Sequence, residues 1–490
     1  MKADLGWALA LSIVAAAAIS PSAACAQPAA ASAEAADSRA RLFVLTDIGA
    51  DPDDTQSLIR LLLYANDIDI EGIAATTSVH KKTAPAPASI RRVIANYAKI
   101  RDNLLLHDPA YPPAETLEGL VSVGQPAYGR AAVGDGKESA GSQALIAALE
   151  RADPRPLWVA AWGGPNTLAQ ALHTIRATRS PEEADRLIAK LRVYAIADQD
   201  DSGPWMREQF PGLFYIVSPG GYGAATWIGM SAVVDGLDNT TISNGWIADN
   251  IQQGHGPFGA SYPDVAYGME GDTPSFLGLI PNGLNAPERP DWGGWGGRYA
   301  LRTPAREETD PGGFTGGVPV PAETRPIWTN STDSVTPFRK NDFGVTIIPM
   351  ERSYTGARET IWRWRDDFQN DFAARMDWTV RGPAEANHPP DVRIQTPARI
   401  QVHSGQHVGL NAFGTTDPDG DNLSFHWFEY REAGTCPAAA TFSGAANLYE
   451  RGFTVPKVDR ECDLHFILRV TDKGSPPLSR YARVIATVVP

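Results

Sequence analysis

Residues 41–54 read RLFVLTDIGADPDD, and this stretch decides the fold of the first part of the chain. The apolar run 41–46 predicts a buried β-strand, and apolar residues at helical spacing follow it over 53–66. The same alternation recurs, with strands expected at 68–76, 157–162, 192–197 and 213–217 and helices at 88–106 and 166–177. Alternating strands and helices predict an α/β domain, a parallel sheet covered by helices on both faces.

A second, smaller domain is expected near the C-terminus. Glycine, proline and tryptophan dominate after about residue 285, a helical pattern returns at 357–379, and the proline pair in 386–390 reads as a linker. From 391 to 490 short alternating strands are separated by turn residues, which predicts an immunoglobulin-like β-sandwich. The first domain therefore spans 40–385. The segment DPDGD at 417–421 resembles polycystic-kidney and cadherin-like modules.

The N-terminus has the pattern of a secretory signal peptide over residues 1–26. Lys2 precedes an apolar run, and Ala24-Cys25-Ala26 forms a cleavage site, so the mature chain is expected to begin with a flexible leader at 27–39. Lipidation at Cys25 is the alternative. Either reading predicts a periplasmic or secreted protein, and no later segment is apolar enough to span a membrane.

Cleavage after Ala26 leaves two cysteines, Cys436 and Cys462. An oxidising compartment favours a disulfide between them.

The net charge of −14 narrows the set of partners. An acidic surface repels phosphate backbones and anionic lipids, so nucleic acid is not expected as a partner and a divalent cation is. A homo-oligomer stays open. The sequence holds no GxSxG motif, and the mature first domain has no cysteine, so neither a serine nor a cysteine nucleophile is supported. It also holds no HExxH motif, so a zinc site of that type is not supported.

Four carboxylates follow the first strand within eight residues: Asp47, Asp51, Asp53 and Asp54. Ligands of open α/β sheets bind at the carboxyl ends of the strands, so this turn is well placed for a site. Clustered carboxylates repel one another unless a cation neutralises them, and a hard cation such as Ca²⁺ prefers oxygen ligands. Helix capping by Asp51, Asp53 and Asp54 is the structural alternative, but it does not account for Asp47.

Further polar and aromatic residues are candidates for binding a sugar. Those after predicted strands are His80, Asn166, Asp198, Asp201 and Trp205. His255 and the pair Trp292 and Trp295 lie in glycine-rich loops, where the tryptophans could stack on a sugar or pack against the domain.

Several motifs resemble the calcium-dependent nucleoside hydrolases. FVLTDIGADPDDTQSLIRLLLYAND resembles the opening strand, acidic turn and helix of that family, and IEGIAATTS resembles the next strand. The turn 162–169 and the segment 270–274 resemble two later motifs. IADQDDSGPW, EGDTPSFLGLIPNGL and IWRWRDDFQNDFAARMDW are closer still to a bacterial nucleoside-hydrolase-like branch described as cellulose-binding, in which a sandwich follows. The resemblance covers roughly residues 40–380.

This resemblance implies roles for individual residues. Asp47 would bind calcium and take a proton from the attacking water, Asp54 and Asp272 would complete the carboxylate ligands with the Trp162 carbonyl, and Asp53 would contact a sugar hydroxyl. Two departures stand out: the opening turn carries two extra residues, and Gly271 occupies the place of the family's leaving-group histidine.

These observations predict a calcium-dependent glycosidase acting on a furanoside or a cell-wall-derived glycan. Glu270 or His255 would protonate the leaving group. Two alternatives remain: a non-catalytic polysaccharide-binding protein on a hydrolase scaffold, and a true nucleoside N-ribohydrolase.

Overall fold

The computed structural model describes residue 1 and residues 39–490, apart from 224, 236–237, 310–320, 341–345 and 350–351. The expected signal peptide, the lipidation site Cys25 and the leader up to residue 38 lie outside the described residues, Met1 excepted. Residues 40–490 form one compact unit. Within the described part of the chain, no helix combines the length and the apolar character that a membrane span requires.

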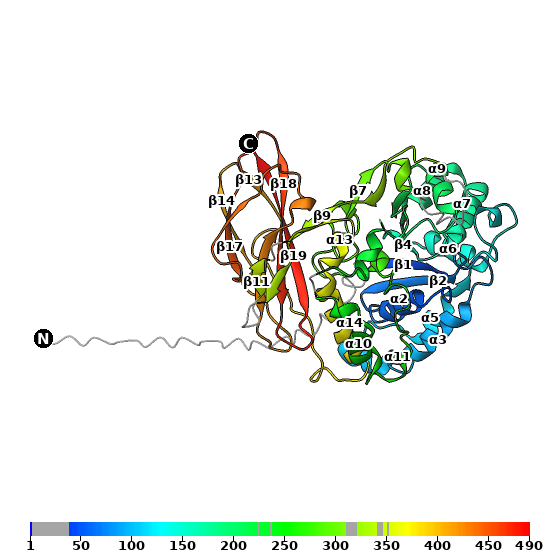
Figure 1. The fold of residues 1–490 in the computed structure, drawn as a ribbon, viewed down its shortest axis with the longest axis horizontal. Helices are drawn as coiled ribbons and strands as arrows, with labels where there is room; N and C mark the ends of the chain where they lie inside the picture. Colours follow the sequence, from blue (N-terminus) through cyan, green and yellow to red (C-terminus); the bar gives the residue numbers. More distant parts are fainter. Residues whose placement is uncertain (2–38, 224, 236–237, 310–320, 341–345, 350–351) are drawn as a thin grey trace. The chain divides into compact units, whose positions relative to one another are not determined.

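An eight-stranded sheet forms the centre of the first domain, in the order β3-β2-β1-β4-β5-β6-β8-β7 (Figure 1). Its strands are β1 (Ala40–Thr46), β2 (Ile68–Ala75), β3 (Val121–Val123), β4 (Leu157–Ala161), β5 (Leu191–Ala195), β6 (Phe214–Val217), β7 (Tyr299–Arg302) and β8 (Ile327–Asn330). All neighbours pair parallel except β7 and β8. The predicted parallel α/β sheet is thus confirmed.

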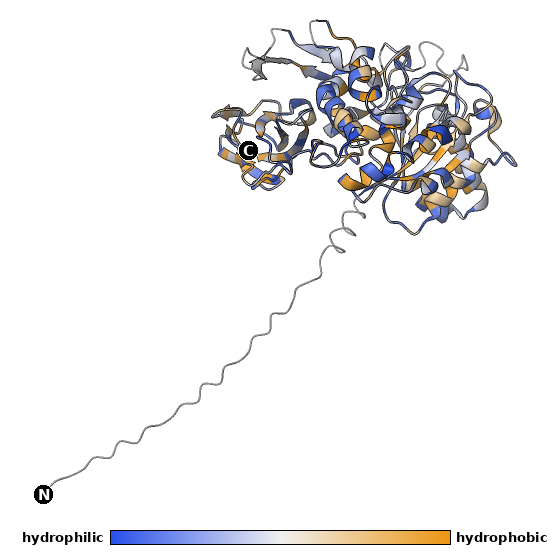
Figure 2. Cartoon of the chain, turned by 90° about the horizontal axis from the view of Figure 1, so that it is seen from below, coloured by the Kyte–Doolittle hydropathy of each residue, from blue (hydrophilic) through white to orange (hydrophobic). Residues whose placement is uncertain are grey.

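Helices cover both faces of this sheet (Figure 1). Alternate side chains of β1 enter two separate cores: Leu42 and Val44 pack with α2, α3 and α14, whereas Phe43 and Leu45 pack with α6, α7 and α8. The helices are α2 (Asp53–Leu62), α3 (Pro87–Tyr97), α4 (Arg101–His107), α5 (Ala114–Gly119), α6 (Ala140–Glu150), α7 (Asn166–Thr178), α8 (Pro181–Ala189), α9 (Ser202–Gln209), α10 (Asn244–Ile247), α11 (Gly256–Gly259), α12 (Pro274–Leu277), α13 (Glu359–Trp362) and α14 (Arg365–Asp377). Figure 2 shows the hydrophobic residues gathered in the strands between them.

The C-terminal residues form the expected β-sandwich around a core that includes Trp427, Phe453 and Phe466. One sheet has the order β13-β19-β18-β15 and the other β14-β17-β16. The strands are β13 (Arg399–His403), β14 (His407–Asn411), β15 (Ser424–Glu429), β16 (Thr441–Ser443), β17 (Glu450–Thr454), β18 (Cys462–Thr471) and β19 (Ser479–Val489). Cys436 and Cys462 are joined, which confirms the predicted disulfide.

Short strands lie in the segment between the two domains. They are β9 (Asp333–Val335), paired with β12 (Tyr354–Gly356), and β10 (Phe338–Lys340), paired with β11 (Thr346–Pro349).

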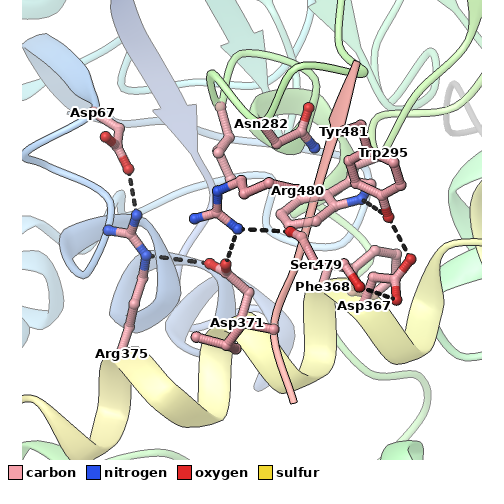
Figure 3. Close-up of polar contacts among 12 residues, drawn as sticks. Asp67, Asn282, Trp295, Asp367, Phe368, Asp371, Arg375, Ser479, Arg480 and Tyr481 are labelled. Carbon is pink, nitrogen blue, oxygen red and sulfur yellow. Dashed lines mark hydrogen bonds and ion pairs between the residues drawn. The ribbon is translucent and has the colours of Figure 1, made fainter. Parts of the chain in front are cut away.

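Strand β19 packs directly on helix α14 through buried polar groups (Figure 3). The Arg480 guanidinium binds Asp371 Oδ2 at 2.6 Å, and the other oxygen of that carboxylate binds Arg375 at 3.2 Å. One turn earlier, Asp367 accepts from Ser479 Oγ at 3.0 Å and from the Tyr481 hydroxyl. The two domains therefore share a core with charges inside it.

The backbone of β19 also docks on the loop after α12. Tyr481 N donates to the Asn282 carbonyl at 2.9 Å, and Trp295 Nε1 donates to the Tyr481 hydroxyl at 3.3 Å. An added Cβ at Gly283 would lie 1.9 Å from the Tyr481 carbonyl oxygen, so the loop must carry glycine to approach so closely. The sequence pattern predicts a separable sandwich, but a chain ending near Pro383 would uncover these buried groups and is expected to lose stability.

Asp371→Ala is predicted to destabilise the whole chain by about 3–5 kcal/mol, because it leaves Arg375 and Arg480 without their shared buried carboxylate. Urea unfolding of the full chain measures this. Arg393→Ala is the control, since that arginine pairs with Asp391 at the exposed surface, where a pair contributes about 1 kcal/mol or less. Equal effects of the two substitutions would contradict a structural role for the interface.

Candidate functional site

The strand order reverses between β1 and β4, and this reversal places a site at their carboxyl ends. Asp47 follows β1 directly, and Trp162 follows β4. The two turns touch, because an added Cβ at Gly163 would lie 2.8 Å from Asp47 Oδ1. A glycine at 163 therefore leaves room for the Asp47 carboxylate.

Asp47 is buried, and its Oδ2 accepts a hydrogen bond from the Ser78 hydroxyl, which follows β2. Burial raises the pKa of Asp47, and the Ser78 hydrogen bond opposes that rise. The hydroxyl thus stabilises the ionised carboxylate and fixes its orientation.

Asp53 and Asp54 begin helix α2 and face the same edge. Asp54 is buried and accepts from the Thr46 hydroxyl; burial, and then the charges of Asp47 and Asp53, raise its pKa well above the ordinary value. Burial and Asp51 do the same to the pKa of Asp53. Local backbone contacts explain part of the acidic turn, since Asp51 Oδ1 accepts from Asp53 N at 3.3 Å. They do not explain Asp47 or Asp54.

Asp272, distant in sequence, completes the group. It is buried beside α12, and its Oδ2 has no hydrogen-bond partner among the described residues. Burial raises the pKa of Asp272 most, followed by the charges of Asp53, Asp54 and Asp47. We call Asp47, Asp51, Asp53, Asp54 and Asp272 the acidic edge.

The donor atoms of the acidic edge suit a hard divalent cation. Oxygen atoms of Asp51, Asp53 and Asp54 lie within 4.8 Å of one another, so of the predicted carboxylate ligands this group contains Asp54 but neither Asp47 nor Asp272. None of the ion pairs formed among the described residues involves any member of the edge. The Trp162 carbonyl accepts from Gln199 Nε2 at 2.6 Å, and a carbonyl oxygen has a second lone pair for another partner. These residues fit a cation held by carboxylate and carbonyl oxygens.

Two side chains stand beside the acidic edge. His80 lies near enough for its charge to lower the pKa of Asp47, and its Nε2 is 3.3 Å from the Tyr222 hydroxyl. Burial raises the pKa of Tyr222, and so do Asp51 and Asp53, although 52% of the residue is exposed. Tyr222 was not predicted from the sequence, although its place after β6, at a strand's carboxyl end, is a usable signal.

Gly271 borders the acidic edge on the side of Asp53. An added Cβ there would lie 3.0 Å from Asp53 Oδ2 and 3.1 Å from the Trp227 ring. A histidine at this position would have to displace one of these neighbours.

A second polar group lies at the carboxyl end of β5. Asp200 is fully buried, which raises its pKa to about 7, and its Oδ2 would lie 2.5 Å from an added Cβ at Gly164. Asn166, also buried, donates to the Ala127 carbonyl at 2.9 Å, while its Oδ1 has no hydrogen-bond partner among the described residues. Of the predicted sugar contacts, Asn166 therefore keeps an unused acceptor.

The neighbouring candidates have structural partners. Asp198 binds the buried Arg207 through both oxygens at 2.8 Å, and Asp201 Oδ1 accepts from Arg130 N at 2.6 Å. The Arg130 guanidinium lies 4.1 Å over the Trp205 ring. These contacts hold the loops around the acidic edge. They give Asp198, Asp201 and Trp205 structural roles that require no ligand.

Two residues predicted as proton donors are committed elsewhere. Glu270 is fully buried, binds Arg60 Nε at 2.7 Å and accepts from the Tyr262 hydroxyl at 2.5 Å. His255 is buried against Asp377 of α14 at 3.0 Å. Both partners, Arg60 and Asp377, lie far away in the sequence, so the local sequence pattern around Glu270 and His255 could not predict these contacts.

The two tryptophans predicted as a stacking platform pack against the sandwich instead. Trp295 is fully buried beside Tyr481, and Trp292 meets the His465 ring edge at 5.0 Å between centroids. Packing was the alternative that the sequence left open.

Comparisons with known proteins agree with this architecture. The family described as "Cellulose-binding Sde182, nucleoside hydrolase-like domain" matches residues 41–299, and that described as "Cellulose-binding protein Sde0182, C-terminal domain" matches residues 407–488. A solved nucleoside hydrolase-related hypothetical protein from Saccharophagus degradans, associated with carbohydrate metabolism, is 34% identical. The alignment covers 92% of this chain and 100% of that chain, with a TM-score of 0.76.

Some solved structures are similar over about a fifth of the chain. Mouse clustered PcdhgC3 EC1–3 is 10% identical over 20% of this chain and 34% of that one, with a TM-score of 0.15. The titin M10–obscurin-like 1 Ig complex is 17% identical over 20% and 93%, with a TM-score of 0.13. Values this low indicate nothing about function, and no curated protein matches the chain.

The match over more than half of the chain, together with the 34% identity to a structure of the same two-part architecture, leads to one conclusion. The chain belongs to the cellulose-binding, nucleoside hydrolase-like family.

Proposed function

We propose that this protein is an exported, calcium-dependent glycoside hydrolase that acts on a furanoside or a cell-wall-derived glycan. The observation that carries the proposal is the acidic edge: buried carboxylates at the switch point of the sheet raise one another's pKa, and the ion pairs of the described residues leave them out. A stable fold keeps such a group when it serves a ligand.

Asp47, Asp54, Asp272 and the Trp162 carbonyl would hold the calcium ion. When bound, calcium would lower the pKa of a water molecule and bind sugar hydroxyls. The carboxylates supply the negative charge that a hard cation requires, and Asp272 Oδ2 is buried without a partner among the described residues.

Asp47 is the general base of this proposal. Its Oδ2 is engaged by Ser78, so its orientation is fixed, and Oδ1 lies against the open face of Gly163. A positioned carboxylate can take the proton of an attacking water as the glycosidic bond breaks through an oxocarbenium-like state. Asp53, on the same edge, would accept a hydrogen bond from a sugar hydroxyl.

The leaving group distinguishes this reaction from nucleoside cleavage. Gly271 replaces the histidine of the nucleoside hydrolases, Glu270 is held in a buried ion pair with Arg60, and His255 Nε2 lies 3.0 Å from the buried Asp377 carboxylate. The rim of the acidic edge offers instead the Tyr222 hydroxyl and the His80 imidazole, which contact each other. An O-linked sugar leaves as a strongly basic alkoxide unless the glycosidic oxygen is protonated, and the Tyr222 hydroxyl or a protonated His80 would donate that proton.

The second candidate function is binding of a polysaccharide without turnover, and the family description favours it. A nucleoside N-ribohydrolase is the third candidate, and the crowded position 271 argues against it.

Calcium is predicted to raise the melting temperature at about pH 7.5 and to have little effect near pH 4.5. The carboxyl groups of the acidic edge have pKa values raised above 3.8, so the folded chain holds their protons more tightly than the unfolded chain does. That stability is present at low pH and is lost as the pH rises through the raised pKa values, where calcium replaces the protons. Calcium at about a hundred times its Kd would add about 2.7 kcal/mol.

Thermal unfolding with calcium or chelator measures the shift, and Asp272→Asn should reduce it. A melting temperature at neutral pH that responds to neither reagent would contradict the cation site.

Asp47→Asn is predicted to lower kcat by about 10²–10⁴-fold at saturating calcium, because an amide cannot accept the water proton. The measurement is hydrolysis of a panel of aryl furanosides, glycans and nucleosides. Asp185→Asn is the matched control, because that aspartate lies exposed on helix α8 and is not part of the acidic edge.

A wild-type chain that holds calcium, binds a glycan and hydrolyses no member of the panel would end the enzyme proposal and leave the binding function.

A further inference from the structure

The outer face of the sheet β14-β17-β16 carries a groove of about 570 Å³. It is far from the acidic edge in the sequence and belongs wholly to the sandwich. Its walls rise from the loop 443–448 on one side and from the ends of β14 and β17 on the others.

Two paired glycines form the floor of the groove. Gly409 of β14 lies opposite Gly452 of β17, and Gly452 lies opposite Ser443 of β16. An added Cβ at Gly409 would meet no atom within 4 Å, so the space above it is open. Above Gly452, by contrast, an added Cβ would lie 2.5 Å from Ser443 Oγ and 2.9 Å from the His407 ring, so these side chains cover that glycine and the open space lies over Gly409.

Hydrogen-bonding groups stand at both ends of this floor. At one end His407 lies across from Thr454, with Nδ1 and Oγ1 separated by 3.4 Å. At the other, Asn411 Nδ2 donates to Glu450 Oε1 at 3.0 Å. One hydrogen-bonded pair thus stands at each end of the trough, and its donors and acceptors can also bind sugar hydroxyls.

Apolar surface continues the groove beyond Asn411. Leu448 lines the wall and is 51% exposed. Phe413 lies in the turn after β14, its N–H donates to Asn411 Oδ1 at 2.7 Å, and the residue is 66% exposed with its ring beside Tyr449. Aromatic rings with one open face pack against the C–H faces of pyranoses, and exposed apolar groups next to polar ones mark binding sites.

We propose that this groove binds a segment of a neutral β-glucan chain, with a sugar ring over Gly409 beside the His407 imidazole and the chain continuing past Asn411 toward Phe413. The net charge of −14 and the Glu450 carboxylate disfavour polyuronic chains. The inference rests on the carbohydrate association in the proposed function, but it is independent of catalysis at the acidic edge.

Gly409→Val in the full chain tests the groove directly. The new side chain meets no neighbour at its Cβ and is β-branched in a strand, so the fold accommodates it while the trough fills. Gly212→Val is the matched control, because an added Cβ there also meets nothing within 4 Å and the site lies in the first domain. The probes are retention on swollen cellulose and calorimetric titration with cellohexaose.

Gly409→Val is expected to weaken both probes at least about tenfold, the effect of about 1.4 kcal/mol of lost contact, with an unchanged melting temperature. Gly212→Val should bind as the wild type does. Phe413→Ala, which removes only an exposed ring, should also lower the affinity for cellohexaose. This variant tests the groove if the Gly409→Val chain has a lowered melting temperature.

Wild-type affinity in the Phe413 variant and in a folded Gly409 variant would overturn the groove, and so would a wild-type chain that binds neither probe. Hydrolysis by the acidic edge is scored separately on small glycosides. Loss of binding with intact turnover, or the reverse, therefore distinguishes a failure of this inference from a failure of the proposed function.

Discussion

Burying a carboxylate is electrostatically unfavourable, and the packing of this structure depends on arginines that pair with several buried carboxylates. Glu71 is paired with Arg41, Glu270 with Arg60, Asp198 with Arg207, and Asp333 and Asp371 each with two arginines. A buried charge without such a partner is strongly unfavourable. The acidic edge departs from this pattern, since none of its members forms an ion pair among the described residues and several of its carboxylates are buried together where the sheet topology places a ligand.

The sequence predicts what depends on local periodicity. The strands that carry the edge and the helix after Asp53 follow from apolar spacing, and the position of Asp47 follows from the end of its strand. The helical pattern at 88–106 is broken in the structure into α3 and α4, and the pattern at 357–379 into α13 and α14. Periodicity locates helical segments better than it locates the turns between them.

Residues with distant partners could not be predicted in the same way. His255 contacts a carboxylate 122 residues later, and Trp295 meets Tyr481 across 186 residues. A histidine or tryptophan in a glycine-rich loop looks alike whether it binds a ligand or packs under another domain. The sandwich decides between these outcomes, because it covers the loop around Gly283 and Trp295 and removes both from solvent.

The segment 270–272 carries both a buried carboxylate that is paired with arginine, Glu270, and one that is not, Asp272. Glu270 has a φ of 49°, which is strained for a residue with a side chain, and it is held there by Arg60, the Tyr262 hydroxyl and a hydrogen bond from its own N–H to Gln56. This turn sends Glu270 into the core and leaves Asp272, two residues later, at the acidic edge. Gly271 between them has no side chain to push Asp53 aside. The arginine-paired glutamate is therefore a positioning residue for the unpaired aspartate, which explains how one short loop serves both the stability of the domain and its site.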